Sequence, residues 1–146
     1  MSFVILLQLI MIYKTNLKIN MFTKEYGVIE DAKLYIEDHS CLTLDIWISL
    51  DNGGKTCLGG WSLAHADEPY IRKNFKKGDP TNYTGYYIAK VLRVAGVKAL
   101  NDVVGKPIRA IIDNERIIGI QSYMGNEFFI PNTDKSEIFE KEENGI

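Results

Sequence analysis

Apolar and polar residues alternate along three consecutive segments near the middle of the chain. Residues 26–37 and 41–50 each place apolar side chains at every second position, and residues 55–63 follow a turn at Asn52-Gly53. A period of two is typical of strands with one buried face, and Asn-Gly between such segments indicates a hairpin. The pattern therefore predicts a meander of three strands with its core on one side.

The period becomes helical further along the chain. From Thr84, apolar residues recur every three or four positions until Gly96, a residue that commonly ends a helix. The remaining segments predict a short helix, a hairpin and a last short strand, over residues 99–104, 107–113, 116–123 and 128–130.

This order of elements leaves no room for parallel crossovers, so we expect an α+β fold. Its antiparallel β-sheet would combine the three-stranded meander with the C-terminal hairpin, beside one main and one short helix. We expect a single ligand-binding domain over residues 21–133. Residues 65–83 lack an apolar period and predict a long surface loop. Residues 134–146 predict a charged tail, either a frayed end or an amphipathic helix.

The chain opens with an apolar segment, Phe3 to Tyr13. It is shorter than the ~20 residues that cross a bilayer, and it lacks the flanking residues of a signal peptide. Two interpretations stay open for residues 1–20: an upstream extension, with translation starting at Met21, or an apolar strand or helix that docks on the domain. We expect no membrane association.

Composition narrows the class of partner. The 146 residues are 46% hydrophobic and 25% charged, with a formal net charge of -2, as in ordinary globular proteins. A protein that coats duplex nucleic acid needs a concentrated basic surface, so we expect no such partner. A small anionic ligand is compatible, because one or two arginines suffice to bind it.

The sequence offers little for catalysis or metal binding. Cys41 and Cys57 are expected to be thiols, and with only two histidines there is no ligand spacing for a metal. Glu37-Asp38-His39 could share a proton as an acid–base cluster, but a cap at a strand end is the favoured interpretation. We therefore predict no catalytic residue, no metal and no cofactor.

Two glycines, Gly59 and Gly60, interrupt the third predicted strand. Such a pair marks either a bulge or a close approach by another backbone or a ligand, and both interpretations stay open. Gly53-Gly54-Lys55-Thr56 resembles the end of a phosphate-binding loop, but no helix follows it, so we reject that motif.

Aromatic residues gather where the main helix begins. Tyr83, Tyr86 and Tyr87 surround Thr84-Gly85 at the positive end of the helix dipole. Purines commonly stack on aromatic rings while phosphates take amides and arginine, so these residues suit a nucleotide. Each tyrosine could instead pack the helix onto the sheet. Lys90 of the same helix is included among the candidate ligand-binding residues.

Two arginines lie on the strands of the C-terminal hairpin. Arg109 alternates with apolar neighbours, and Arg116 begins the partner strand. A pair of guanidinium groups on adjoining strands can clamp an anion. Alternation of surface charge is the other interpretation, and it is favoured modestly for Arg116.

With these residues together, the chain resembles the first Thoeris anti-defence family of phages, whose members sequester cyclic ADP-ribose signals made by bacterial TIR-domain proteins. The resemblance covers about residues 28–131. The motifs that carry it are Leu34-Tyr-Ile-Glu-Asp-His39, Leu58-Gly-Gly-Trp-Ser-Leu63, Tyr87-Ile-Ala-Lys-Val-Leu-Arg-Val94 with Gly96-Val97, and Gly105-Lys-Pro-Ile-Arg109.

The resemblance implies a binding protein without turnover in the host bacterial cytoplasm, a homodimer or a hexamer built from dimers. It implies a cyclic ADP-ribose isomer as ligand, and in some members a cyclic trinucleotide at separate sites. Tyr87 and Arg109 would contact the nucleotide, and Gly59-Gly60 would lie near a ligand or an interface. Lys55-Thr56-Cys57 stand where this family usually has glycine or glutamine, which puts a second pocket there in doubt.

Three functional hypotheses follow. The leading one is a sponge that encloses a cyclic ADP-ribose isomer at subunit interfaces, with Arg109 on the phosphates and tyrosines against the adenine. The second is an inhibitor that binds a host defence effector through Trp47, Trp61 and the tail. The third is a small nucleotide hydrolase or lyase that uses Glu37-Asp38-His39.

Overall fold

The computed structural model describes residues 2–16, 20–65 and 83–145, and over these ranges it confirms an α+β fold. One antiparallel sheet has the strand order β3-β2-β1-β5-β6-β7, and β4 pairs with β2 off this path. The strands are β1 (Thr23–Ile36), β2 (Cys41–Leu50), β3 (Lys55–Leu58), β4 (Ala64–His65), β5 (Pro107–Asp113), β6 (Arg116–Ser122) and β7 (Phe128–Phe129). The helices of the described residues are α1 (Phe3–Asn16), α3 (Tyr83–Ala95), α4 (Thr133–Glu143) and the 3-10 helix η1 (Leu100–Asp102).

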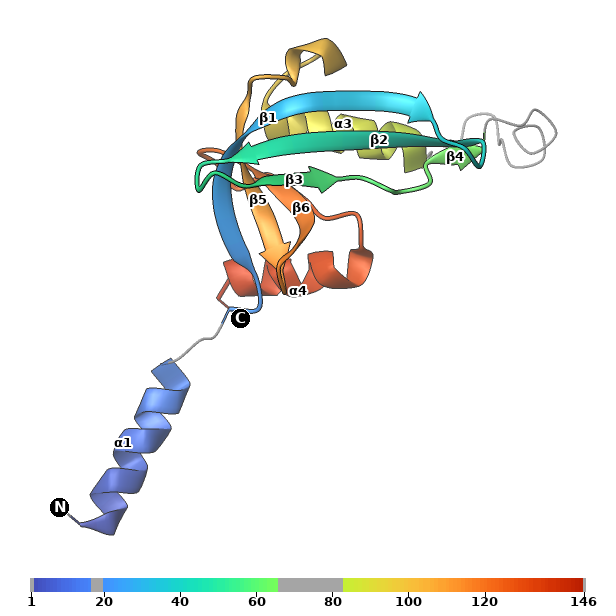
Figure 1. The fold of residues 1–146 in the computed structure, drawn as a ribbon. Helices are drawn as coiled ribbons and strands as arrows, with labels where there is room; N and C mark the ends of the chain where they lie inside the picture. Colours follow the sequence, from blue (N-terminus) through green and yellow to red (C-terminus); the bar gives the residue numbers. More distant parts are fainter. Residues whose placement is uncertain (1, 17–19, 66–82, 146) are drawn as a thin grey trace.

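Strand β1 joins the two halves of the sheet. Its first residues, 23–28, pair with β5, and residues 27–36 pair with β2. The register with β2 shifts between Ile29 and Asp31, which marks a bulge. Bulges bend a strand and increase its twist. Figure 1 shows the bend of the sheet: β5 and β6 run across the direction of β2 and β3.

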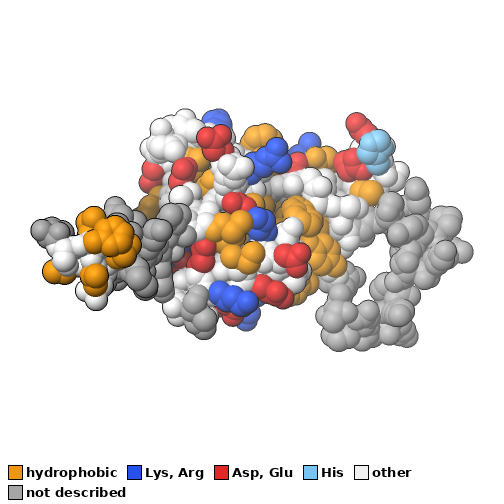
Figure 2. Space-filling model, turned by 90° about the horizontal axis from the view of Figure 1, so that it is seen from below, with side chains coloured by type: hydrophobic (Ala, Val, Ile, Leu, Met, Phe, Trp, Pro, Cys, Tyr) orange, Lys and Arg blue, Asp and Glu red, His pale blue; other side chains and the backbone are white. Residues whose placement is uncertain are grey.

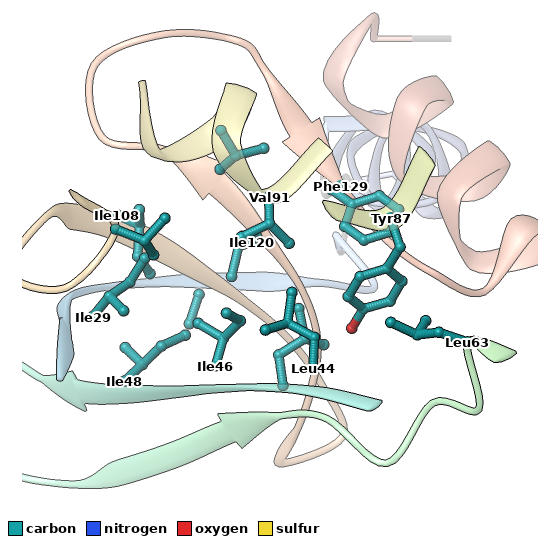
Figure 3. Packing of buried hydrophobic residues seen from close by; sticks show 14 residues of the cluster. Ile29, Leu44, Ile46, Ile48, Leu63, Tyr87, Val91, Ile108, Ile120 and Phe129 are labelled. Carbon is teal, nitrogen blue, oxygen red and sulfur yellow. The ribbon is translucent and has the colours of Figure 1, made fainter. Parts of the chain in front are cut away.

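Helix α3 covers one face of the sheet and closes the main core. Its Tyr87, Val91 and Val94 are buried against the strands. Strand β2 contributes every second residue to this core, as its alternating sequence predicts. Figure 3 shows the ring of Tyr87 beside Phe129, above the aliphatic side chains of β2.

Helix α4 covers part of the opposite face. Its Phe139 is 1% exposed and packs against Phe22 and Phe128, with ring centroids 5.8 and 4.8 Å apart. Asn132 caps the helix by accepting a hydrogen bond from the backbone amide of Lys135. The expected boundary at residue 133 therefore does not separate a tail from the fold. Figure 2 shows acidic and basic side chains interspersed on the face seen from below.

The N-terminal segment forms helix α1, which Figure 1 shows projecting away from the sheet. Its apolar side chains over residues 3–9 are exposed, from 45% at Leu7 to 75% at Phe3. They do not pack on the described part of the domain, so the docking interpretation fails for these residues. No described helix is long and apolar enough to cross a bilayer.

Other differences from the sequence prediction are local. The third strand stops at Leu58 rather than continuing to Leu63, and the short second helix is a single 3-10 turn. Most of the predicted surface loop, residues 66–82, lies outside the described residues.

Candidate functional site

A groove lies at the open edge of the sheet, where β7 is the last strand. Its volume is about 570 Å³. One wall is α3 and the other is α4, while β7 and the loop before it form the floor. The lining residues are Tyr86 and Lys90 from α3, Ser136 and Glu140 from α4, and Asn126, Glu127, Phe128, Phe129 and Ile130 between them. Pockets of this volume are typical for ligands of nucleotide size.

The α3 wall presents an aromatic ring and a cation. Tyr86 is 51% exposed, and its ring meets the edge of Phe129 with centroids 6.1 Å apart. Lys90 lies one helical turn further along, with its Nζ 5.7 Å from the centre of the Tyr86 ring. This spacing of four residues places both side chains on one face of the helix. The sequence-predicted residues Tyr86 and Lys90 are therefore brought together here.

Tyr87 does not belong to this surface, which corrects its assignment to ligand binding. The side chain is completely buried, and its ring packs edge-on against Phe129 at 4.8 Å. Its hydroxyl has no hydrogen-bond partner among the described residues. Figure 3 shows the hydroxyl directed into aliphatic side chains. Burial raises the pKa of Tyr87 well above its usual range. The position is a core position, one residue away from the exposed Tyr86.

Tyr83 lies outside the lining of the groove, at the start of α3. It is 38% exposed, and its ring contacts that of Tyr87 with centroids 6.1 Å apart. Burial, with a smaller contribution from Tyr86, raises the pKa of Tyr83. Its neighbour Thr84 donates a side-chain hydrogen bond of 2.8 Å to the carbonyl of Leu63, which fixes the helix start to the sheet.

Arg109 lies on the opposite face of the sheet from α3, so the predicted cage does not form within one chain. Its neighbours Ile108 and Ala110 are buried in the core under α3, and alternation sends Arg109 the other way. Its Nε donates to the carbonyl of Ser122 at 3.0 Å, and its Nη2 donates to the carbonyl of Gly125 at 2.6 Å. The guanidinium therefore fixes the loop between β6 and β7.

Arg116 is exposed at the turn of the same hairpin. It pairs in register with Asp113, whereas Arg109 pairs with Gln121. Four residues of strand separate the two arginine positions, or roughly 13 Å at 3.3 Å per residue. They do not form an anion clamp within one chain.

The glycine pair has a structural explanation. A Cβ atom on Gly59 would lie 2.1 Å from Oδ1 of Asp45, so any larger residue there would force that carboxylate or the backbone to shift. The same Oδ1 accepts a hydrogen bond of 3.3 Å from the amide of Gly60, and Oδ2 accepts one of 2.8 Å from the hydroxyl of Tyr35. Gly60 has φ of 78°, a conformation that favours glycine. The close approach at Gly59 is therefore made by the side chain of Asp45, which is neither the predicted bulge nor the predicted approach by another backbone or a ligand.

Glu37, one of the three residues considered for catalysis, serves local structure. Glu37 accepts backbone hydrogen bonds from His39 at 2.9 Å and Cys41 at 3.3 Å, which closes the turn between β1 and β2. Burial and, less strongly, Asp45 raise the pKa of the Cys57 thiol to about 11. A protonated thiol is a poor nucleophile. Among the described residues no three His, Cys, Asp or Glu side chains are grouped as metal ligands.

Four polar residues of the groove were not predicted from the sequence as site residues: Asn126, Glu127, Ser136 and Glu140. Asn126 and Glu127 lie in a loop without a recognisable motif, and Ser136 and Glu140 lie in the segment predicted as a charged tail. The spacing of four residues between Ser136 and Glu140 was the one signal that these two side chains share a helix face.

Searches of protein-family models, curated protein sequences and solved structures find no match to this chain.

Proposed function

We propose that this chain is a phage anti-defence sponge that binds and sequesters a cyclic ADP-ribose isomer without degrading it, and so blocks Thoeris immunity in the host cytoplasm. The observation that carries the proposal is the groove of about 570 Å³ with an exposed tyrosine and a lysine on one wall. The resemblance of its sequence motifs to the first Thoeris anti-defence family is the second support.

The groove has the groups that such a ligand requires. The half-exposed ring of Tyr86 offers a stacking surface for adenine, held in place by its edge contact with Phe129. The ammonium group of Lys90 offers a cation for a phosphate. Asn126 and Ser136 offer amide and hydroxyl groups for hydrogen bonds.

Binding without turnover agrees with how the reactive groups are used. Glu37 is occupied with turn amides, and the Cys57 thiol, with a pKa of about 11, stays protonated at neutral pH. A hydrolase would need a nucleophile or a general base in reach of the ligand. Among the described residues that line the groove there is no histidine and no cysteine.

Self-association into a homodimer, or a hexamer of dimers, is part of the proposal, as is a separate site for a cyclic trinucleotide. Self-association is supported by the outer sheet face, which we define by Tyr26, Val28, Trp47 and Tyr123. These side chains are 39–48% exposed on the face away from α3, and the rings of Tyr26 and Tyr123 are in contact. Exposed aromatic residues are enriched in protein interfaces.

The same outer sheet face favours a second candidate function, a protein that inhibits a host defence effector by binding it. Trp47 remains available for that role at 44% exposure, whereas Trp61 is half-buried against the main core. Pull-down of a single host protein that is lost on Trp47→Ala would favour this alternative.

The test of the sponge is isothermal titration of the protein with a panel of cyclic ADP-ribose isomers. We expect one isomer to bind, and Tyr86→Leu to weaken its binding by at least about fivefold, because the lost base stacking is worth about 1–3 kcal/mol. The control is Val104→Ala, which truncates a similarly exposed apolar side chain outside both the groove and the outer sheet face and should leave affinity unchanged. Release of the intact ligand on denaturation distinguishes a sponge from a hydrolase. Absence of binding by every isomer would refute the proposal.

A further inference from the structure

The charges around the groove differ from those of an ordinary phosphate site. Lys90 supplies one positive charge, while Glu127 and Glu140 supply two negative charges, so the lining carries a formal charge of -1. A bisphosphate held among these groups would meet like charges, which disfavour binding. The groove therefore suits a part of the ligand that carries no charge.

The carboxylates of Glu127 and Glu140 also have no recorded side-chain partner among the described residues. The structure records no ion pair or side-chain hydrogen bond between Glu127 or Glu140 and another described residue, although Lys90 lines the same groove. Ionised carboxylates accept strong hydrogen bonds from hydroxyl groups, and an acidic side chain on a ribose hydroxyl is a recurrent device in nucleotide sites.

The walls place these groups at opposite sides of one slot. Tyr86 and Lys90 are four residues apart on α3, and Ser136 and Glu140 are four residues apart on α4. The edge of β7, with Phe129 against the Tyr86 ring, lies between them. An aromatic surface on one side and hydroxyl and carboxylate groups on the other match the two parts of a nucleoside.

We propose that the groove recognises the nucleoside half of the ligand, a purine ring on Tyr86 with its ribose hydroxyls donating to Glu127 or Glu140, while the phosphates point out of the groove past Lys90. This inference rests on the proposed function and specifies which half of the nucleotide the site reads. It makes the two glutamates specificity residues for ribose.

The decisive experiment is titration of Glu140→Gln and Glu127→Gln with the cyclic ADP-ribose isomer that binds the unmodified protein. Glutamine keeps the shape and removes the charge. If a carboxylate accepts a ribose hydroxyl, loss of that charge-assisted bond weakens binding about tenfold or more in at least one variant. If phosphates occupy the groove, both variants relieve repulsion and bind more tightly.

Glu137→Gln is the matched control, because Glu137 is exposed on the same helix and does not line the groove. It should leave the affinity unchanged. Free adenosine should compete with the cyclic ligand, and 2′-deoxyadenosine should compete less well or not at all.

The outcomes separate the two proposals. Absence of binding of any cyclic ADP-ribose isomer refutes the sponge and this inference together. Binding by the unmodified protein with unchanged or tighter binding in both glutamine variants refutes the nucleoside assignment and leaves the sponge intact. Failure of adenosine to compete would also overturn the assignment.

Discussion

Replacing Tyr87 with phenylalanine should stabilise the protein. In most cores a buried tyrosine hydroxyl donates a hydrogen bond, and its removal weakens the fold. Here the hydroxyl is buried without a partner among the described residues, in a side chain that has no exposed surface. An unsatisfied buried polar group costs about 1–3 kcal/mol, and Tyr87→Phe removes that cost.

The magnitude follows from two opposing terms. The substitution leaves a void the size of one oxygen atom, which at about 24 cal/mol per Å³ costs a few tenths of a kcal/mol. The net gain is then about 1–2 kcal/mol. For a chain of this length, each kcal/mol raises Tm by roughly 2–4 °C.

The pH dependence gives a second signature. The ordinary pKa of 10.0 applies in the unfolded chain, and burial raises the pKa of Tyr87 in the folded protein. Above pH 10 the unfolded state therefore loses a proton that the folded state keeps, so stability falls by about 1.4 kcal/mol per pH unit. Below pH 10 both states keep the proton and this term is constant. The variant lacks the term, so its advantage should grow above pH 10.

Urea denaturation of both proteins at pH 8 and pH 11 measures both effects. Tyr86→Phe is the matched control, because that hydroxyl is on a half-exposed side chain and its loss should change stability by less than about 0.5 kcal/mol. A Tyr87→Phe variant that is less stable at pH 8 would mean that the hydroxyl has a partner, and the absence of an added advantage at pH 11 would contradict the raised pKa of Tyr87.

Three further predictions concern other parts of the fold. Gly59→Ala should destabilise by about 1–3 kcal/mol in urea denaturation, because its Cβ would lie 2.1 Å from Oδ1 of Asp45, and the cost should shrink in an Asp45→Ala background. Equal costs in both backgrounds would contradict the steric explanation. Phe139→Ala should cost about 3–5 kcal/mol if α4 is part of the core, and a cost below 1 kcal/mol would show that it is not. Alkylation of Cys57, followed by mass spectrometry, should accelerate about tenfold per pH unit up to about pH 11, and a plateau near pH 8 would refute the burial of this thiol.

The strands were predictable because one face of each is buried. The alternation in residues 41–50 appears in the structure as Leu44, Ile46 and Ile48 at 0% exposure, with Trp47 on the other face at 44%. The contact at Gly59 was not predictable. It involves the carboxylate of Asp45, which lies 14 residues earlier in the sequence and occupies the space that a side chain at Gly59 would need.

The candidate site was predictable only in part. Helical periodicity places Tyr87 on the same face as the buried Val91 and Val94, whereas the contact of Tyr86 with Phe129 of a two-residue strand was not visible in the sequence. Arg109 was expected beside these rings. Its strand has one face under α3, and the face of a single residue within that strand follows from register rather than from residue type.

The role of the last segment depended on a single residue. Residues 134–146 are highly charged, and Phe139 supplies the main apolar anchor of α4. The groove exists because this helix packs at the sheet edge, so its Ser136 and Glu140 could not be assigned to a site before the packing was known.

The central claim is that a cyclic ADP-ribose isomer binds in the groove between α3 and α4. Isothermal titration of the unmodified protein and of Tyr86→Leu with that ligand tests it most directly. The claim predicts saturable binding to the unmodified protein, at least about fivefold weaker binding to the variant, and recovery of the ligand unchanged. Equal affinities for the two proteins, or no heat of binding with any isomer, would contradict it.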